Sequence, residues 1–141
     1  MRIISGMLFL SALACAPEPT SPADTDLGGV WTATAHLYTL SNFRLEIVQE
    51  SQGIVSGKWS AKRDGDGTGC PTGTLCDTGG DLIGRNTVSQ VEIQLFGAGR
   101  FEGVLIQPNQ LRGIYAVNES YDIIVFNRTS TTVSIDRKEH R

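Results

Sequence analysis

Three cysteines, Cys15, Cys70 and Cys76, are the residues of this sequence with the clearest capacity for chemistry. Cys70 and Cys76 are separated by five residues in the longest stretch without strand patterning. A thiolate metal site needs about four ligands, and the sequence has no second cysteine pair to complete one. In an oxidising compartment, cysteines at this spacing form a disulfide that contributes about 2 to 3 kcal/mol. We predict a Cys70–Cys76 disulfide and no metal site, and this prediction depends on export.

The N-terminus has the pattern of an export signal. One cation, Arg2, precedes an apolar run of about 11 residues, which at ~1.5 Å each is too short to span a ~30 Å hydrocarbon layer. Residues 12–15, Ala-Leu-Ala-Cys, resemble the lipobox of bacterial lipoproteins, although Ala12 stands where Leu is commoner. The resemblance implies that Cys15 is acylated and becomes the new N-terminus. An ordinary cleaved signal peptide is the alternative.

The segment after Cys15 is predicted to be a tether. It holds three of the chain's five prolines, three acids and no large apolar side chain, so it cannot bury enough surface to fold. At about 3.1 Å per residue it holds the domain up to ~30 Å from a bilayer. The location implied is the cell envelope, on the outer membrane if the cell is Gram-negative. The predicted organisation is a signal peptide at 1–14, lipidated Cys15 and tether at 15–26, a folded domain at 27–129 and a polar tail at 130–141, where residues 132–135 are a candidate ninth strand.

An Asp/Gly-rich stretch before Cys70 partly matches a calcium-binding loop. Asp64, Asp66 and the residues that follow them fit positions 1, 3, 5 and 6 of such a loop. Position 12 is Leu75 in place of the bidentate Glu, and no flanking helices are predicted. A hydrated turn is therefore the favoured interpretation, with calcium binding as the alternative.

The remaining polar residues do not form a catalytic pattern. The two histidines, His36 and His140, are far apart in the sequence, and no nucleophile-elbow, zinc-protease or phosphate-loop motif occurs. The acids Glu46 and Glu92 fall on predicted solvent-facing positions. With 12 basic and 15 acidic residues, the formal net charge is −3, which does not suit a nucleic-acid binder. We expect neither enzyme activity nor a cofactor.

The middle of the chain is patterned as short β-strands. The 141 residues include 16 glycines, about 11% against a typical ~7%, and 19% charged residues against a typical ~25%. Apolar and polar residues alternate with a period of two, as Trp31, Ala33 and Ala35 show, and short turn-forming breaks separate the runs. The predicted strands are 30–38, 42–49, 53–61, 80–85, 87–96, 100–106, 110–117 and 121–128.

A repeated glycine pattern favours closure of these strands into a barrel. Residues 55–59, 101–105 and 111–115 share the order apolar-x-Gly-x-apolar, with the glycine in mid-strand. Mid-strand glycine is typical of sharply coiled strands in small barrels. We therefore predict an all-β, eight-stranded antiparallel up-and-down barrel, with a β-sandwich as the alternative.

At the first predicted strand the sequence resembles the calycin superfamily of lipocalins, avidins and bacterial metalloprotease inhibitors. Residues 29–31, Gly-Val-Trp, match its G-x-W motif, and Arg128 stands where those families place a cation over the tryptophan. In a barrel the first and last strands pair, so Trp31 and Arg128 can form a cation–π contact contributing about 0.5 to 2 kcal/mol. The residues after Trp31 lack the avidin-type polar ligands, which argues against biotin.

Two functions follow from this fold. The favoured one is a surface-tethered binding or interaction module that contacts an envelope protein, which includes a protease inhibitor of the kind that the resemblance allows. The alternative is a carrier of a small apolar ligand, because small residues such as Ala33, Gly103 and Gly113 could leave room inside. A hollow barrel favours the carrier and a filled one the module. The candidate ligand-lining residues are Trp59, Tyr115, Phe43 and Phe101.

Overall fold

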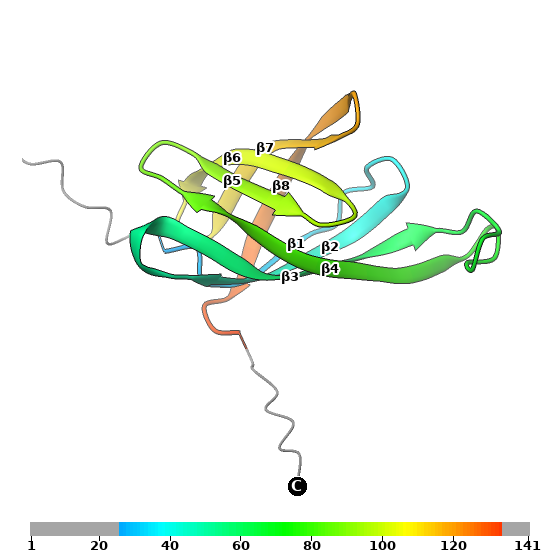
Figure 1. Cartoon of the computed structure of the whole chain (residues 1–141), viewed down its shortest axis with the longest axis horizontal. Coiled ribbons are helices and arrows are strands. Elements are labelled where there is room, and N and C mark those ends of the chain that lie inside the picture. Colours follow the sequence, from blue (N-terminus) through cyan, green and yellow to red (C-terminus); the bar gives the residue numbers. More distant parts are fainter. Residues whose placement is uncertain (1–25, 134–141) are drawn as a thin grey trace, which may run out of the picture.

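The computed structural model describes residues 26–133, which form a closed barrel of eight antiparallel strands in sequence order (Figure 1). This confirms the predicted up-and-down barrel and excludes the sandwich. The predicted signal peptide, Cys15 and most of the tether and polar tail lie outside the described residues. The strands are β1 Gly29–Ala33, β2 Leu40–Gln49, β3 Ile54–Asp64, β4 Leu75–Asn86, β5 Val91–Leu95, β6 Gly99–Gln107, β7 Gln110–Val117 and β8 Ser120–Ser130, with a short 3₁₀ turn at Ser51–Gly53.

The barrel closes where β1 pairs with both β2 and β8. Val30 pairs with Ser130 and Trp31 with Arg128, with a register shift between the two pairs. This pairing leaves no open sheet edge among the described strands, because each strand has two hydrogen-bonded neighbours. The exposed edge of a β-sandwich, a common site of aggregation, is therefore avoided.

The β1 strand is shorter than predicted. The prediction of residues 30–38 was wrong at its C-terminal end, because β1 ends at Ala33. Leu37 and Leu40 exchange backbone hydrogen bonds of 2.8 and 3.0 Å and close a tight turn in which Tyr38 has a φ of 57°. Leu37 remains buried, so the apolar alternation continues into the turn although the strand pairing does not.

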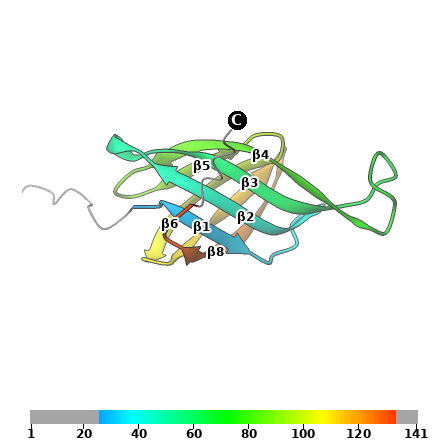
Figure 2. The same cartoon turned by 90° about the horizontal axis from the view of Figure 1, so that it is seen from below.

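Strands β3 and β4 are longer than predicted and continue past the barrel wall as a hairpin. The sequence predicted strands at 53–61 and 80–85, whereas β3 runs to Asp64 and β4 begins at Leu75. Register pairs continue to Asp64 and Leu75. Figures 1 and 2 show this hairpin projecting beyond the other connections at that end. Residues 75–81 have no buried side chain, so this part of β4 carries no apolar alternation that could reveal it.

Other predicted strand ends also differ: β2 begins at Leu40 and not at residue 42, and β8 runs to Ser130 and not to residue 128. The fifth strand begins at Val91 and not at residue 87, because Thr87 N donates to Gln90 O at 2.8 Å and forms a turn. Residues 131–133 are not in a strand, and the rest of the candidate ninth strand lies outside the described residues.

The two ends of the barrel differ in what they carry. Both ends of the described chain lie at one end, with the turns at residues 50–53, 87–90 and 108–109; we call this the terminal end. The opposite end, which we call the mouth, carries residues 34–39, 96–98 and 118–119 and the projecting hairpin. Between them, the inward side chains of all eight strands form one buried cluster.

Candidate functional site

At the terminal end, Trp31 and Arg128 lie together on adjacent strands. The guanidinium carbon of Arg128 lies 4.5 Å from the Trp31 ring centroid. Trp31 is fully buried, and its Nε1 donates to the backbone oxygen of Leu27 at 2.8 Å. Arg128 also donates a hydrogen bond to the backbone oxygen of Asp26. Together these contacts hold the entering chain against the end of the barrel.

The environment of Arg128 indicates a structural role. Burial lowers the pKa of the guanidinium from its ordinary value, and the Asp26 carboxylate partly opposes this. Within residues 26–133, Arg128 Nε is buried and has no hydrogen-bond partner. A buried donor left unpaired costs about 1 to 3 kcal/mol, comparable with the ~0.5 to 2 kcal/mol of a cation–π contact. The pair therefore closes the barrel with little net stabilisation beyond the packing of Trp31.

Of the four predicted ligand-lining aromatics, Phe43 and Phe101 lie in the packed interior, whereas Trp59 and Tyr115 reach the mouth. Phe43 packs edge-on against Tyr115, with ring centroids 5.4 Å apart, and Phe101 packs edge-on against Phe126 at 5.6 Å. Phe43 also meets Phe126 at 6.3 Å. Edge-to-face rings at these distances are favourable contacts, each worth about 0.5 to 1.5 kcal/mol beyond burial. The middle of the barrel is thus a packed aromatic core.

The mid-strand glycines do not leave room inside the barrel. A Cβ placed on Gly103 would lie 2.5 Å from Phe101 Cζ, so the Phe101 ring already occupies that space. A Cβ on Gly113 would lie 2.5 Å from Gly103 Cα on the neighbouring strand. Because these glycines have no side chain, β6 and β7 approach each other closely and the Phe101 ring lies against Gly103. The space that their missing side chains suggested is filled.

A small pocket remains at the mouth. Its volume is about 200 Å³, and Trp59, Tyr115 and Tyr38 contribute to its lining, whereas Phe43 and Phe101 do not. Trp59 Nε1 donates to Phe96 O at 3.1 Å, and the Tyr115 hydroxyl donates to Ala98 O at 2.7 Å. Both polar groups are paired with backbone, but Thr39, Arg63 and Thr78 also line this pocket, so its lining is partly apolar and partly polar. Ligand pockets more often measure ~300 to 1,000 Å³.

The Tyr115 hydroxyl, buried at the mouth end of the core, has a strongly shifted pKa. Burial raises the pKa of Tyr115 to about 12, with a smaller contribution from Tyr38. Its hydroxyl is therefore a neutral hydrogen-bond donor throughout the physiological range. It ties β7 to the β5–β6 turn and is not poised for proton transfer near neutral pH.

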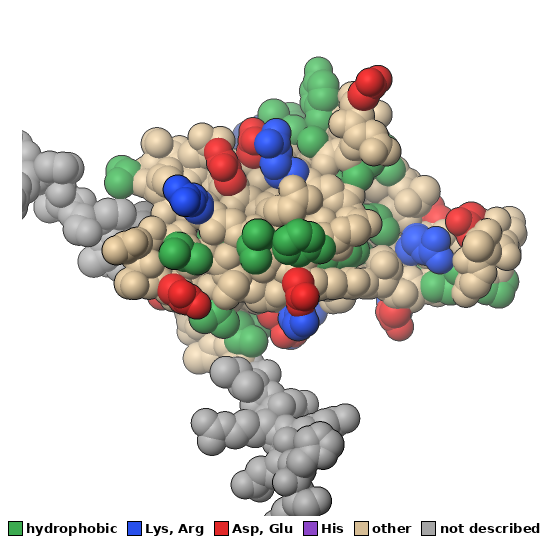
Figure 3. All heavy atoms as spheres, in the orientation of Figure 1, with side chains coloured by type: hydrophobic (Ala, Val, Ile, Leu, Met, Phe, Trp, Pro, Cys, Tyr) green, Lys and Arg blue, Asp and Glu red, His purple; other side chains and the backbone are tan. Residues whose placement is uncertain are grey.

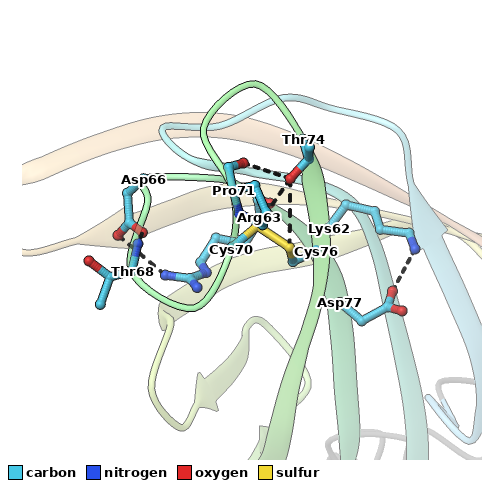
Figure 4. Close-up of a disulfide and its surroundings, with 9 residues drawn as sticks. All are labelled: Lys62, Arg63, Asp66, Thr68, Cys70, Pro71, Thr74, Cys76 and Asp77. Carbon is cyan, nitrogen blue, oxygen red and sulfur yellow. Dashed lines mark hydrogen bonds and ion pairs between the residues drawn. A yellow bond between two sulfur atoms is a disulfide. The ribbon is translucent and has the colours of Figure 1, made fainter.

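The disulfide lies near the tip of the projecting hairpin (Figure 4). Cys70 and Cys76 are bonded, with Cα atoms 6.0 Å apart. Thr74 Oγ1 donates to Pro71 O at 2.6 Å inside the closed loop. Further back, Lys62 Nζ donates to Asp77 Oδ1 at 2.6 Å across the two strands. The tip is therefore held by one covalent bond and by polar contacts.

In the Asp/Gly-rich loop, for which calcium binding was the alternative interpretation, the carboxylates contact other side chains and the backbone. Asp64 Oδ2 lies 3.0 Å from His36 Nε2, and Asp66 Oδ2 lies 3.5 Å from Arg63. Asp66 Oδ1 also accepts from Thr68 N at 2.7 Å, which is the hydrogen bond of an Asx turn. Across residues 26–133, no group of three or more His, Cys, Asp or Glu side chains is placed to hold a metal ion. The geometry supports the hydrated-turn interpretation.

The outer wall carries apolar side chains between charged ones (Figure 3). An open groove of about 490 Å³ crosses β3 to β6, with Ile54 and Ile83 beside Arg85, Glu92 and Arg100. Arg44 pairs with Glu46, and Arg100 with Glu102, at 3.0 and 2.9 Å. Glu46 and Glu92 lie on this wall, as the sequence indicated. This groove was not foreseen, because it depends on which outward residues become neighbours around the barrel.

Sequence reasoning also missed two interior residues, Ile124 and Phe126. Both are 1% exposed, but the run Ile-Ile-Val-Phe at residues 123–126 does not alternate, so it does not show which face is inward. They can be identified from Arg128, which was predicted to meet Trp31. Every second residue of a strand lies on the same face, so Phe126 and Ile124 share the face of Arg128.

Comparison with protein-family models, with curated proteins and with solved structures finds no significant match. The observed barrel is compatible with a calycin-like small barrel. Residues 26–133 contain no helix with the length and apolar character needed to span a membrane.

Proposed function

We propose that this chain is an exported, lipid-anchored, calycin-like barrel that acts as a binding or interaction module for another envelope protein. It is not an enzyme in this proposal. The observation that carries it is the filled interior, in which Phe43, Phe101, Phe126 and Tyr115 pack on one another. A barrel whose centre is occupied by its own side chains recognises partners through its outer surface.

The projecting β3–β4 hairpin is the contact surface in this proposal. It extends beyond the mouth, and the Cys70–Cys76 bond fixes its tip before any partner arrives (Figure 2). A preorganised loop loses less conformational freedom on binding, which favours affinity. Leu75, at the start of β4, is 56% exposed and offers an apolar contact beside the charged pairs.

A carrier of a small ligand is the second candidate, because of the mouth pocket. Its volume of about 200 Å³ suits only a small molecule, with Trp59 and Tyr115 offering aromatic contact and Arg63 a polar one. Lipid attachment at Cys15 is common to both candidates and follows from the lipobox resemblance. Acylation of one cysteine by several chains anchors a protein stably, since each buried CH₂ contributes about 0.8 kcal/mol.

Native mass spectrometry of the protein purified from its own cells tests these proposals. We expect acyl-chain mass on the peptide that begins at Cys15 and a co-purifying polypeptide. An unmodified Cys15 peptide would refute the anchor. A retained small molecule without a polypeptide would replace the module by the carrier.

A matched pair of variants tests the role of the hairpin. Leu75→Arg should abolish recovery of the polypeptide, whereas Ile123→Arg, at a 57% exposed position on the β8 outer wall, should retain it. Equal recovery with both variants would show that the hairpin is not the contact surface.

A further inference from the structure

Apolar side chains are exposed around part of the terminal end. Val88, at the tip of the β4–β5 turn, is 78% exposed, the largest value among the large apolar residues of the described chain. Val88 and Val104 line the same shallow depression, and Ile106 follows on β6. On the other side of Val88, Ile54 is exposed at the start of β3. We call Ile54, Val88, Val104 and Ile106 the apolar rim.

The turns that carry this rim are almost uncharged. The turns at residues 50–53, 87–90 and 108–109 contain a single charged residue, Glu50. On the adjacent strands the rim has basic neighbours, because Ile54 pairs with Arg85 and Val104 pairs with Arg112. Apolar groups flanked by arginines are suited to the interfacial layer of a bilayer that contains anionic lipid, where the apolar groups are buried and the arginines face the headgroups.

The chain enters the barrel beside this rim. Gln49 Oε1 accepts from Leu27 N at 3.0 Å and from Asn86 Nδ2 at 2.9 Å, so it joins the entering segment to strand β4. Asn86 immediately precedes the turn that carries Val88. Ten residues separate Cys15 from Asp26, a contour of about 30 Å at ~3.1 Å per residue. A lipid on Cys15 therefore keeps the terminal end within reach of the bilayer surface.

We infer that the apolar rim is a membrane-docking surface, which rests the terminal end on the bilayer and directs the β3–β4 hairpin away from it. This inference rests on the proposed function for the lipid at Cys15. Each exposed Val or Ile contributes little alone, but the tether makes contact effectively intramolecular, so weak contacts suffice. Docking would fix the orientation of the barrel and so present the hairpin to partners beyond the membrane.

Paramagnetic relaxation on a nanodisc tests the docking directly. The chain of residues 15–141 is coupled through the Cys15 thiol to a maleimide lipid in a phosphatidylcholine–phosphatidylglycerol nanodisc that contains spin-labelled headgroups. We expect strong relaxation enhancement at the amides of Val88, Ile54 and Ile106 and little at Thr68 in the hairpin tip. Equal enhancement at both ends, or greater enhancement at Thr68, would overturn the inference.

Matched variants separate docking from tethering. Val88→Ser with Ile106→Ser should lower the ratio of docked to undocked protein at least about tenfold, because the two substitutions remove apolar carbons that are only partly buried on docking. Ile123→Ser, which removes an equally exposed side chain from the outer wall, should leave the ratio unchanged. An unaltered ratio in the double variant would also overturn the inference.

The two proposals fail separately in these experiments. The nanodisc attachment is chemical, so the docking result does not depend on natural acylation. Suppose that Cys15 is unmodified in cells but the terminal end still faces the nanodisc. This result would refute natural lipid attachment and leave the docking of the apolar rim intact. An acylated Cys15 without orientation would refute only the docking.

Discussion

The barrel interior and the β3–β4 hairpin are stabilised by different kinds of interaction. In the interior, Trp31, Phe101 and Tyr115 are buried and touch other apolar side chains. In residues 75–81 of the hairpin no side chain is buried. The backbone ladder and exposed ion pairs hold the two strands together, and the disulfide joins the connecting loop to β4. The interior thus supplies most of the folding free energy, whereas the hairpin has a defined shape with little core of its own. A region of this second kind is free to vary for recognition without unfolding the barrel.

Removing Trp31 should have the largest effect. Trp31→Ala leaves a cavity at the terminal end and also frees Arg128, so we expect a loss of about 3 to 5 kcal/mol in the free energy of unfolding, measured by urea denaturation. Trp31→Phe keeps a ring below Arg128 but loses the hydrogen bond to Leu27 O, and should cost less. A loss below about 1 kcal/mol for the alanine variant would contradict the conclusion that Trp31 is a stabilising residue of the core.

Alkaline pH should destabilise the barrel through Tyr115. Its pKa is raised to about 12 in the folded state, so the unfolded chain gives up this proton more readily. The stabilisation is complete below pH 10 and is lost as pH rises through about 12, by roughly 2 to 3 kcal/mol. Urea denaturation between pH 8 and 12 should show this slope.

Variants assign the alkaline slope to one residue. Tyr115→Phe should reduce the slope while costing about 1 kcal/mol at neutral pH for the lost hydrogen bond to Ala98. The exposed Tyr121→Phe should leave the slope in place. The same slope in wild type and Tyr115→Phe would show that another group causes it.

Removing the disulfide should act on the hairpin and spare the interior. Replacing Cys70 and Cys76 together by Ser removes a short loop closure from the unfolded chain, so we expect a loss of about 2 kcal/mol in urea denaturation. The near-ultraviolet circular dichroism of the buried Trp31 and Tyr115 should be unchanged. Loss of that signal would mean that the interior depends on the hairpin.

Breaking a surface ion pair of the hairpin should have the smallest effect. Lys62 and Asp77 are partly and largely exposed, so a double-mutant cycle with alanine at both positions should give a coupling of at most about 0.5 kcal/mol. The coupling should vanish at 1 M salt, where screening is strong. A coupling above about 1 kcal/mol would contradict the view that polar contacts stabilise the hairpin only weakly in comparison with apolar packing in the interior.

The same distinction explains which parts of the fold could be predicted. Some strands bury one face, such as the one that carries Phe43 and Leu45. Their alternation of apolar and polar residues reveals that they are strands and which of their faces points inward. The Gly-Val-Trp motif and Arg128 also indicated which strands meet. The far part of β4 has no buried face, so its sequence resembles a loop.

The candidate site was harder to predict because it depends on how much space the side chains fill inside the barrel and on which residues become neighbours when the sheet closes. Composition suggested room at Gly103, but only the structure shows the Phe101 ring in that space. Likewise, Val88 and Ile54 are far apart in the sequence, and the order of strands around the barrel brings them to one end. Such relations are properties of the closed sheet and not of any single segment.

The entry of the chain at the terminal end has a mechanical consequence. The start of the described chain and the tip of the β3–β4 hairpin lie at opposite ends of the barrel, so a force applied between them runs along the strands (Figure 1). The hydrogen bonds of β1 to β2 and β8 lie across that direction, so they are loaded in shear and must break together rather than one by one. The closed barrel is therefore expected to resist a force applied between the start of the described chain and the hairpin tip.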